Sequence, residues 1–269
     1  MDPVVDLGTP FLRFERQGPL AFCTIDRPQS RNALSGAMYY GVKKAVSHVN
    51  QLTRQGDACA LIITGVGDVF APGGELRGKV EDHDPRFDFI VPSDALPFEE
   101  IRHSIAPVVS AVNGICQGGG LLIAMLSDVA VASDRATFRA PELLRGIADT
   151  GYGSYLPPHI GVANARDLML TARKIDAQEA LRMGLIARVV PHDTVMEAAR
   201  EAAEQILMTA PEARMHVKRI INDNYGKPDR MSMDWSVFRG AEAREGMQAF
   251  AEKRSPNWIP EALRSGKRL

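Results

Sequence analysis

Short apolar runs alternate with longer amphipathic stretches over the first two thirds of the chain. The short runs predict strands at 20–26, 60–64, 108–112 and 129–132. Between the first two, the apolar positions keep the spacing of one helix face, at Met38, Val42, Ala45, Val46, Val49 and Leu52. Strands that alternate with helices predict crossover units, in which helices cover a largely parallel sheet.

The last third of the chain has helical patterns only. After Arg188–Pro191 no run is strand-like, and the apolar positions predict helices over 195–206, 212–222 and 233–253. We therefore divide the chain into a core over 1–190 and a helical region over 191–269. The segment 75–100 is rich in charge and proline without a clear period, so it is predicted to be a long loop.

Charge and cysteine content narrow the function classes. The 32 Lys and Arg nearly balance 33 Asp and Glu, which leaves no reason to expect nucleic acid or an anionic membrane as a partner. Cys23, Cys59 and Cys116 lie in apolar runs and are interpreted as buried, reduced thiols. No apolar run reaches the ~20 residues of a membrane span, and no leader pattern is present. A cytoplasmic protein is expected, and the six histidines lack the spacing of a metal site.

Three consecutive glycines, Gly118–Gly120, stand between the strand 108–112 and an apolar helix predicted over 121–126. The first N–H groups of a helix have no partner within it, and the helix dipole favours negative charge there. Bare backbone at such a point indicates an anion or oxyanion site. The alternative is a tight turn whose glycines only permit close packing.

A second glycine-rich turn follows the strand at 61–65. Pro72 biases Ala71 toward an extended conformation, and Gly73 and Gly74 then allow a turn. We expect an exposed N–H at Ala71.

The two turns carry a family resemblance. The segment FAPGGEL at 70–76 resembles the F-[SAC]-[AS]-G-[AG]-D-[LI] loop of the crotonase (enoyl-CoA hydratase/isomerase) superfamily, and AVNGICQGGG at 111–120 resembles its A-x-x-G-x-x-x-G-G-G segment. Order and spacing also fit, and further matches extend from about Pro10 to Trp258.

The resemblance implies an α/β fold, a crotonase-type spiral of ββα units, with a C-terminal helical layer that builds homotrimers or pairs of trimers. It implies acyl-CoA thioester substrates, with coenzyme A as part of the substrate and no other cofactor. The thioester carbonyl is expected between the N–H groups of Ala71 and Gly119, an oxyanion hole. Phe87, Phe89 and Ile90 are candidates for the acyl pocket. Coenzyme A is expected at Ser30, Arg31, Asn32, Gly73 and Lys253.

Acid–base residues decide the reaction. Hydratases of this superfamily use two glutamates, and the first position is Leu122 here, whereas the second is kept as Glu142. Leu122 transfers no proton, so the usual hydration is disfavoured and isomerase-type proton transfer by Glu142 is favoured. An acid at a helix start is the plainer interpretation of Glu142.

Asp149 is a second candidate. The segment 146–154 (GIADTGYGS) is similar to the G-S-F-D-G-G-[YW]-G-[AS] stretch of naphthoate synthases, in which the matching aspartate acts in ring closure. This keeps C–C bond chemistry open, and a helix N-cap is the plainer alternative. If Asp149 and Glu142 lie close together, one of them stays protonated near neutral pH. A non-catalytic acyl-CoA-binding member is the remaining alternative.

Overall fold

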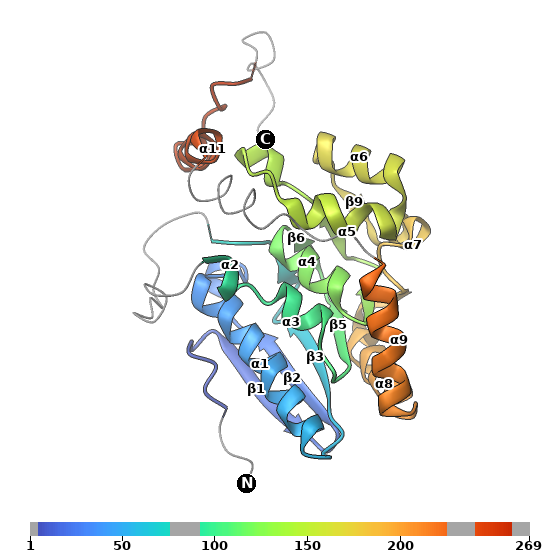
Figure 1. The fold of residues 1–269 in the computed structure, drawn as a ribbon. Helices are drawn as coiled ribbons and strands as arrows, with labels where there is room; N and C mark the ends of the chain where they lie inside the picture. The colour runs from blue at the N-terminus through green and yellow to red at the C-terminus, as the bar shows by residue number, and fades with distance from the viewer. Residues whose placement is uncertain (1–4, 76–91, 225–239, 260–269) are drawn as a thin grey trace.

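The computed structural model describes residues 5–75, 92–224 and 240–259 (Figure 1). Two sheets form its centre. One has six strands in the order β1 (Leu12–Gln17), β2 (Leu20–Ile25), β3 (Ala60–Gly65), β5 (Val108–Val112), β7 (Val129–Ser133) and β10 (Arg188–Val190). The other has four, in the order β4 (Val69–Ala71), β6 (Ile115–Gln117), β8 (Thr137–Arg139) and β9 (Ile175–Asp176).

The two sheets are built together, turn by turn. β3 is followed by β4, β5 by β6 and β7 by β8, so each turn of the chain adds one parallel strand to each sheet. This repeat is the expected spiral of ββα units. The strand runs predicted from the sequence are confirmed as β2, β3, β5 and β7.

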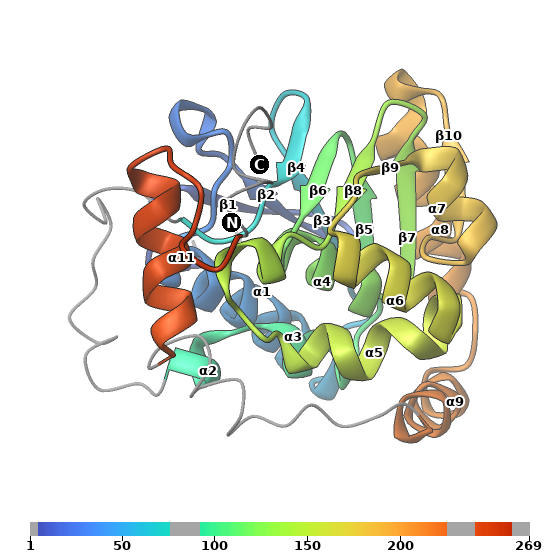
Figure 2. The same cartoon turned by 90° about the horizontal axis from the view of Figure 1, so that it is seen from above.

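Both faces of the larger sheet are covered. Along β2 and β3, alternate residues enter two different cores: Cys23 and Ile63 pack on one face, and Phe22 and Ile62 on the other. α1 (Gly36–Arg54) and α4 (Gly119–Leu126) contribute to the first core, and α8 (Val195–Leu207) to the second. Figure 2 shows α1 and α4 on the same side of the sheet. Burial on both faces explains why β2, β3, β5 and β7 are continuous apolar runs.

The remaining helices surround this centre. α1 begins after its N-cap Ser35, whose hydroxyl accepts a hydrogen bond from the Met38 N–H. The predicted helices of the last third are confirmed as α8, α9 (Pro211–Asp223) and, for its described part, α11 (Ala241–Ala251), while 225–239 lies outside the described residues. The other helices are α2 (Pro92–Ala95), α3 (Phe98–Arg102), α5 (Thr150–Ile160), α6 (Val162–Thr171), α7 (Ala177–Met183), α9 (Pro211–Asp223), α11 (Ala241–Ala251) and the 3₁₀ turns η1 (Pro28–Ser30), η3 (Glu142–Arg145) and η4 (His192–Thr194).

Within the described ranges, no helix is long and apolar enough to cross a membrane. The three cysteines are buried and free, as the apolar runs around them predict.

Candidate active site

The two glycine-rich turns meet at one edge of the smaller sheet. β4 and β6 are parallel neighbours, so the segments that follow them leave the sheet side by side. A Cβ on Gly73 would lie 3.4 Å from the Cα of Gly118 and 3.6 Å from the N of Gly119. Leu34 holds the first turn, because its N–H donates to the Gly73 carbonyl at 2.9 Å and its carbonyl accepts from the Glu75 N–H at 2.8 Å.

Gly118 and Gly120 serve packing rather than ligand access. A Cβ on Gly120 would lie 2.3 Å from the carbonyl oxygen of Ala71, so α4 packs directly on β4 there. Gly118 has a φ of 54°, and a Cβ on it would lie 3.0 Å from Glu142 Oε1. The packing interpretation therefore applies to Gly118 and Gly120, and the oxyanion site stays a prediction for Gly119.

Gly119 lies against Tyr39 at the start of α4. It is the first residue of α4, and its N–H has no acceptor among the residues that the structure describes. A Cβ on Gly119 would lie 2.0 Å from the hydroxyl oxygen of Tyr39, a residue of α1. Tyr39 was not predicted from the sequence, because it follows the core position Met38 in an amphipathic helix and belongs to no motif.

The exposed N–H expected at Ala71 is not found, because Ala71 is fully buried within β4. Gly74 is the exposed residue of that turn. Its neighbours Gly73 and Glu75 make the hydrogen bonds to Leu34, and the Gly74 N–H has no acceptor in the described part of the chain. A Cβ on Gly74 would lie 3.7 Å from the Tyr39 hydroxyl. Gly74 and Gly119 therefore both lie close to this hydroxyl, and the oxyanion role of Ala71 stays a prediction.

Glu142 lies directly beside the glycine turn. It begins η3 after Pro141, and its Oε1 is the atom nearest to a Cβ on Gly118. Its Oε2 is buried and has no hydrogen-bond partner among the described residues. Burial, and then the negative charge of Asp149, raise the pKa of Glu142 to about 8. A group with this pKa gains and loses a proton near neutral pH.

Asp149 is the N-cap of α5, as one interpretation of the sequence predicted. Its Oδ1 accepts hydrogen bonds from the N–H groups of Gly151 at 2.8 Å and Tyr152 at 3.2 Å. Burial raises the pKa of Asp149, whereas these two hydrogen bonds lower it. A Cβ on Gly151 would lie 2.9 Å from this Oδ1 and 3.8 Å from the side chain of Leu122, so an apolar residue lies close to the carboxylate.

Asp149 and Glu142 are electrostatically coupled, since the charge of Asp149 raises the pKa of Glu142. Their environments differ. Two N–H groups stabilise the Asp149 anion, while Glu142 Oε2 is buried without a donor. The negative charge is therefore favoured on Asp149 and the proton on Glu142.

α5 also fastens the glycine turn. The hydroxyl of Tyr152 donates to the Gly118 carbonyl at 2.6 Å, and the Gly118 N–H donates to the Arg139 carbonyl at 3.2 Å. Tyr152 is fully buried. These bonds hold both ends of the Gly118 backbone, so the start of α4 is fixed between α5 and β8.

Of the residues expected to bind coenzyme A, Ser30 ends η1, and Arg31 is exposed in the left-handed region with a φ of 51°. The Asn32 side chain is 1% exposed; it accepts from the Arg27 N–H and donates to the carbonyl of Val69 at 2.7 Å. It joins η1 to the turn before β4.

Lys253 lies in the exposed turn after α11, and no hydrogen bond or ion pair joins its side chain to the other predicted site residues. Phe87, Phe89 and Ile90 lie outside the described residues. Among the residues that are described, no group of three or more His, Cys, Asp or Glu is placed to hold a metal ion.

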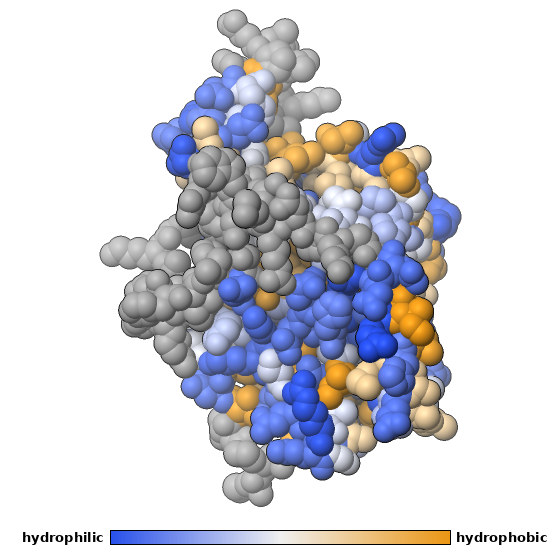
Figure 3. Space-filling model, viewed as in Figure 1, coloured by the Kyte–Doolittle hydropathy of each residue, from blue (hydrophilic) through white to orange (hydrophobic). Residues whose placement is uncertain are grey.

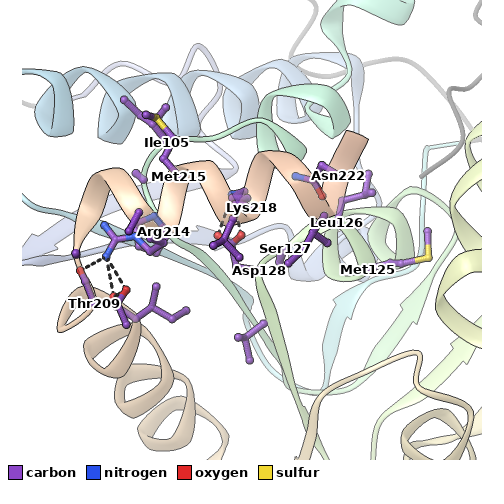
Figure 4. Close-up of a pocket in the computed structure, with 18 of the residues that line it drawn as sticks. Ile105, Met125, Leu126, Ser127, Asp128, Thr209, Arg214, Met215, Lys218 and Asn222 are labelled. Atoms are coloured by element: carbon purple, nitrogen blue, oxygen red, sulfur yellow. Dashed lines mark hydrogen bonds and ion pairs between the residues drawn. The ribbon is translucent and has the colours of Figure 1, made fainter. Parts of the chain in front are cut away.

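A cavity of about 570 Å³ lies elsewhere, between α9 and the end of α4 (Figure 4). Among the residues that line this cavity, Lys218 of α9 forms an ion pair with Asp128 at 2.8 Å. Arg214 of the same helix donates a hydrogen bond to the Thr209 carbonyl. None of the predicted site residues lines it. The candidate active site is therefore the glycine turn with Glu142 and Asp149.

Comparison with known proteins agrees with this geometry. The family model described as enoyl-CoA hydratase/isomerase matches residues 15–261. A carnitinyl-CoA dehydratase of Citrobacter koseri is 34% identical over 259 residues, which cover 92% of this chain and 97% of that protein.

Solved structures give the same result. An enoyl-CoA hydratase/isomerase from Pseudoalteromonas atlantica T6c superposes with a TM-score of 0.78 at 28% identity, covering 93% of this chain and 100% of that one. A carnitinyl-CoA hydratase from Mycobacterium avium superposes with a TM-score of 0.76 at 33% identity, covering 94% of this chain and 99% of that one. The chain therefore belongs to the enoyl-CoA hydratase/isomerase family, within the crotonase superfamily.

Proposed function

We propose that this protein moves a proton along the acyl chain of an enoyl-CoA thioester, converting a 3-enoyl into a 2-enoyl thioester. The observation that carries the proposal is the Glu142 carboxyl. It is buried without a described partner for Oε2, its pKa is raised to about 8, and its Oε1 lies 3.0 Å from the position of a Cβ on Gly118, the residue before Gly119. Leu122 replaces the second acid that hydration needs.

The proposed reaction begins with the thioester oxygen between the N–H groups of Gly74 and Gly119. Ionised Glu142 removes a proton from the α-carbon, and the electrons move onto the thioester oxygen, where the two donors stabilise the enolate. Glu142 then returns the proton to the γ-carbon, and the double bond comes to lie between the α- and β-carbons. One carboxyl group performs both transfers, so no second acid is required.

A second candidate is the elimination of water from a 3-hydroxyacyl-CoA, or its reversal. It is favoured by the name carnitinyl-CoA dehydratase of the 34% identical relative and by the presence of Asp149 near Glu142. Glu142 would again take the α-proton, and Asp149, once protonated, would give a proton to the leaving hydroxyl. Asp149 is also the residue on which C–C bond chemistry would depend.

We also propose that the backbone of Ser30, Arg31, Asn32 and Gly73 receives the coenzyme A portion, with Lys253 contributing from a neighbouring copy in a homotrimer or a pair of trimers. The side chain of Asn32 is already used within the fold, which supports a backbone contact there. Apolar side chains on α9 support self-association: Val217, Ile220 and Ile221 are 56%, 59% and 49% exposed. Figure 3 shows apolar surface beside polar surface on the side of α9.

The test is a comparison of three substrates: trans-3-hexenoyl-CoA, crotonyl-CoA and 3-hydroxybutyryl-CoA. Isomerisation of the first, lost in Glu142→Gln and kept in Asp149→Asn, supports proton transfer by Glu142 alone. Hydration of crotonyl-CoA or dehydration of 3-hydroxybutyryl-CoA that needs both acids supports the second candidate. Tight coenzyme A binding without turnover of any of the three contradicts both and favours a binding protein. Glu204→Gln, at an exposed position of α8, is the matched control.

A further inference from the structure

The hydroxyl of Tyr39 lies at the centre of the candidate site. The position of a Cβ on Gly119 is 2.0 Å from this oxygen, and that of a Cβ on Gly74 is 3.7 Å away. The N–H groups of both residues have no acceptor in the described part of the chain. The Tyr39 hydroxyl makes no hydrogen bond with any described residue. Three donor groups without a described acceptor therefore belong to residues that lie close together.

The Tyr39 ring is held in place by its neighbours. It belongs to the first turns of α1, and it meets the ring of Phe98 edge to face at 6.1 Å between centroids. A phenylalanine would make the same contact, so packing alone gives no reason for the hydroxyl. Gly119 accommodates the hydroxyl because any side chain at that position would overlap it.

The hydroxyl is a donor rather than an anion. Burial, followed by the negative charges of Glu142 and Asp149, raises the pKa of Tyr39 above its ordinary value. Loss of its proton is therefore strongly disfavoured near neutral pH. A neutral phenol next to two backbone N–H groups presents a proton to whatever oxygen they bind.

We propose that Tyr39 is a further catalytic residue, whose hydroxyl donates a third hydrogen bond to the thioester oxygen. The inference rests on the proposed function, because it assumes a thioester between Gly74 and Gly119. The hydrogen bond strengthens as charge moves onto the oxygen, so Tyr39 acts on the enolate more than on the bound substrate. It transfers no proton, and Glu142 remains the residue that does.

The test compares Tyr39→Phe with Tyr40→Phe. Tyr40 is the next residue of α1, and its ring lies under the Lys44 ammonium at 5.3 Å, away from the glycine turn. Removal of one donor from an oxyanion site lowers kcat by about 100-fold. We expect a loss of this order for trans-3-hexenoyl-CoA in Tyr39→Phe, with KM nearly unchanged, and no loss in Tyr40→Phe.

A second readout is the infrared carbonyl band of bound crotonyl-CoA labelled with carbon-13 at the thioester carbon. Binding to the wild-type protein is expected to lower its frequency, and Tyr39→Phe to reverse part of that shift. This readout needs no turnover, so it tests Tyr39 even if the proposed reaction is wrong. An unchanged carbonyl band and kcat in Tyr39→Phe would overturn the inference, as would a gain in kcat, which would show that the hydroxyl obstructs the site.

Discussion

Replacing Glu142 by glutamine removes a carboxyl group that is costly to ionise in the folded protein. The pKa of Glu142 rises from its ordinary value of 4.5 to about 8, first because the group is buried and second because Asp149 carries a negative charge nearby. A rise of this size corresponds to up to about 5 kcal/mol between the protonated and ionised forms. Glutamine has nearly the same shape and never ionises.

The direction in which stability changes with pH follows from whether the folded or the unfolded protein holds the proton. Below pH 4.5 Glu142 is protonated in both the folded and the unfolded protein, so it imposes no electrostatic cost. Between pH 4.5 and about 8 the folded state keeps the proton that the unfolded state has lost, so the free energy of unfolding falls as pH rises. Above about pH 8 the cost is complete. Glu142→Gln removes this loss and is expected to be more stable than the wild type at alkaline pH.

Thermal unfolding at about pH 5 and about pH 9 measures the effect. For a chain of this size, a change of 1 kcal/mol in the free energy of unfolding shifts Tm by about 2 to 4 °C. We therefore expect Glu142→Gln to raise Tm by about 10 °C at about pH 9 and by little at about pH 5. Glu204→Gln, the exposed control, should leave the difference between the two pH values unchanged. Equal Tm values for Glu142→Gln and wild type at about pH 9 would refute the assignment of a raised pKa to this group.

The activity of the wild-type protein is expected to rise with pH, whereas its stability falls. The ionised form of Glu142 removes the α-proton, so kcat/KM should rise with pH until about pH 8 and then level off. Glu142→Gln should lose activity by at least about 100-fold at every pH. A wild-type profile that is flat from about pH 6 to about pH 9 would contradict the role of Glu142 as the base.

Three further predictions concern packing, capping and assembly. Gly120→Ala should lower the free energy of unfolding by more than about 2 kcal/mol, because its Cβ would lie 2.3 Å from the Ala71 carbonyl oxygen. Gly153→Ala, in α5 with open space around it, should raise that free energy by about 0.5–1 kcal/mol. Chemical denaturation measures both changes. Asp149→Ala should lower the free energy of unfolding by about 1 kcal/mol through loss of the N-cap, and Asp149→Asn should lower it much less. A loss of activity in Asp149→Asn without a loss of stability would therefore show a chemical role. Ile220→Asp, 59% exposed on α9, should shift the protein to smaller species in light scattering if α9 joins copies, and an unchanged mass would argue against that interface.

Four strands of the larger sheet were predictable because they are buried on both faces. β2, β3, β5 and β7 are continuous apolar runs, and such runs are visible without any structure, whereas β1 alternates between buried and exposed residues and was not predicted. The strands β4, β6, β8 and β9 are only two or three residues long. No periodicity can be recognised over so few residues, and their pairing depends on contacts between segments far apart in the sequence.

The candidate site was predictable where a residue belongs to a motif. Gly119, Glu142 and Asp149 were identified because the segments around them resemble motifs of the crotonase superfamily. The expectation of an exposed N–H at Ala71 was wrong, because the local effect of Pro72 says nothing about the packing of β4 against α4. Tyr39 lies 80 residues before Gly119 in the sequence, and only the folded chain brings its hydroxyl to the glycine turn.

The distribution of charge explains how one carboxyl group can serve the proposed reaction. Two backbone N–H groups stabilise Asp149 as an anion, and its charge makes Glu142 a stronger base. When Glu142 takes the α-proton, its negative charge disappears as an equal charge forms on the thioester oxygen near Gly119. The net charge of the site is thus unchanged by the transfer. The donors around the oxygen then determine how far the equilibrium favours the enolate, which is why one missing donor should affect kcat more than KM.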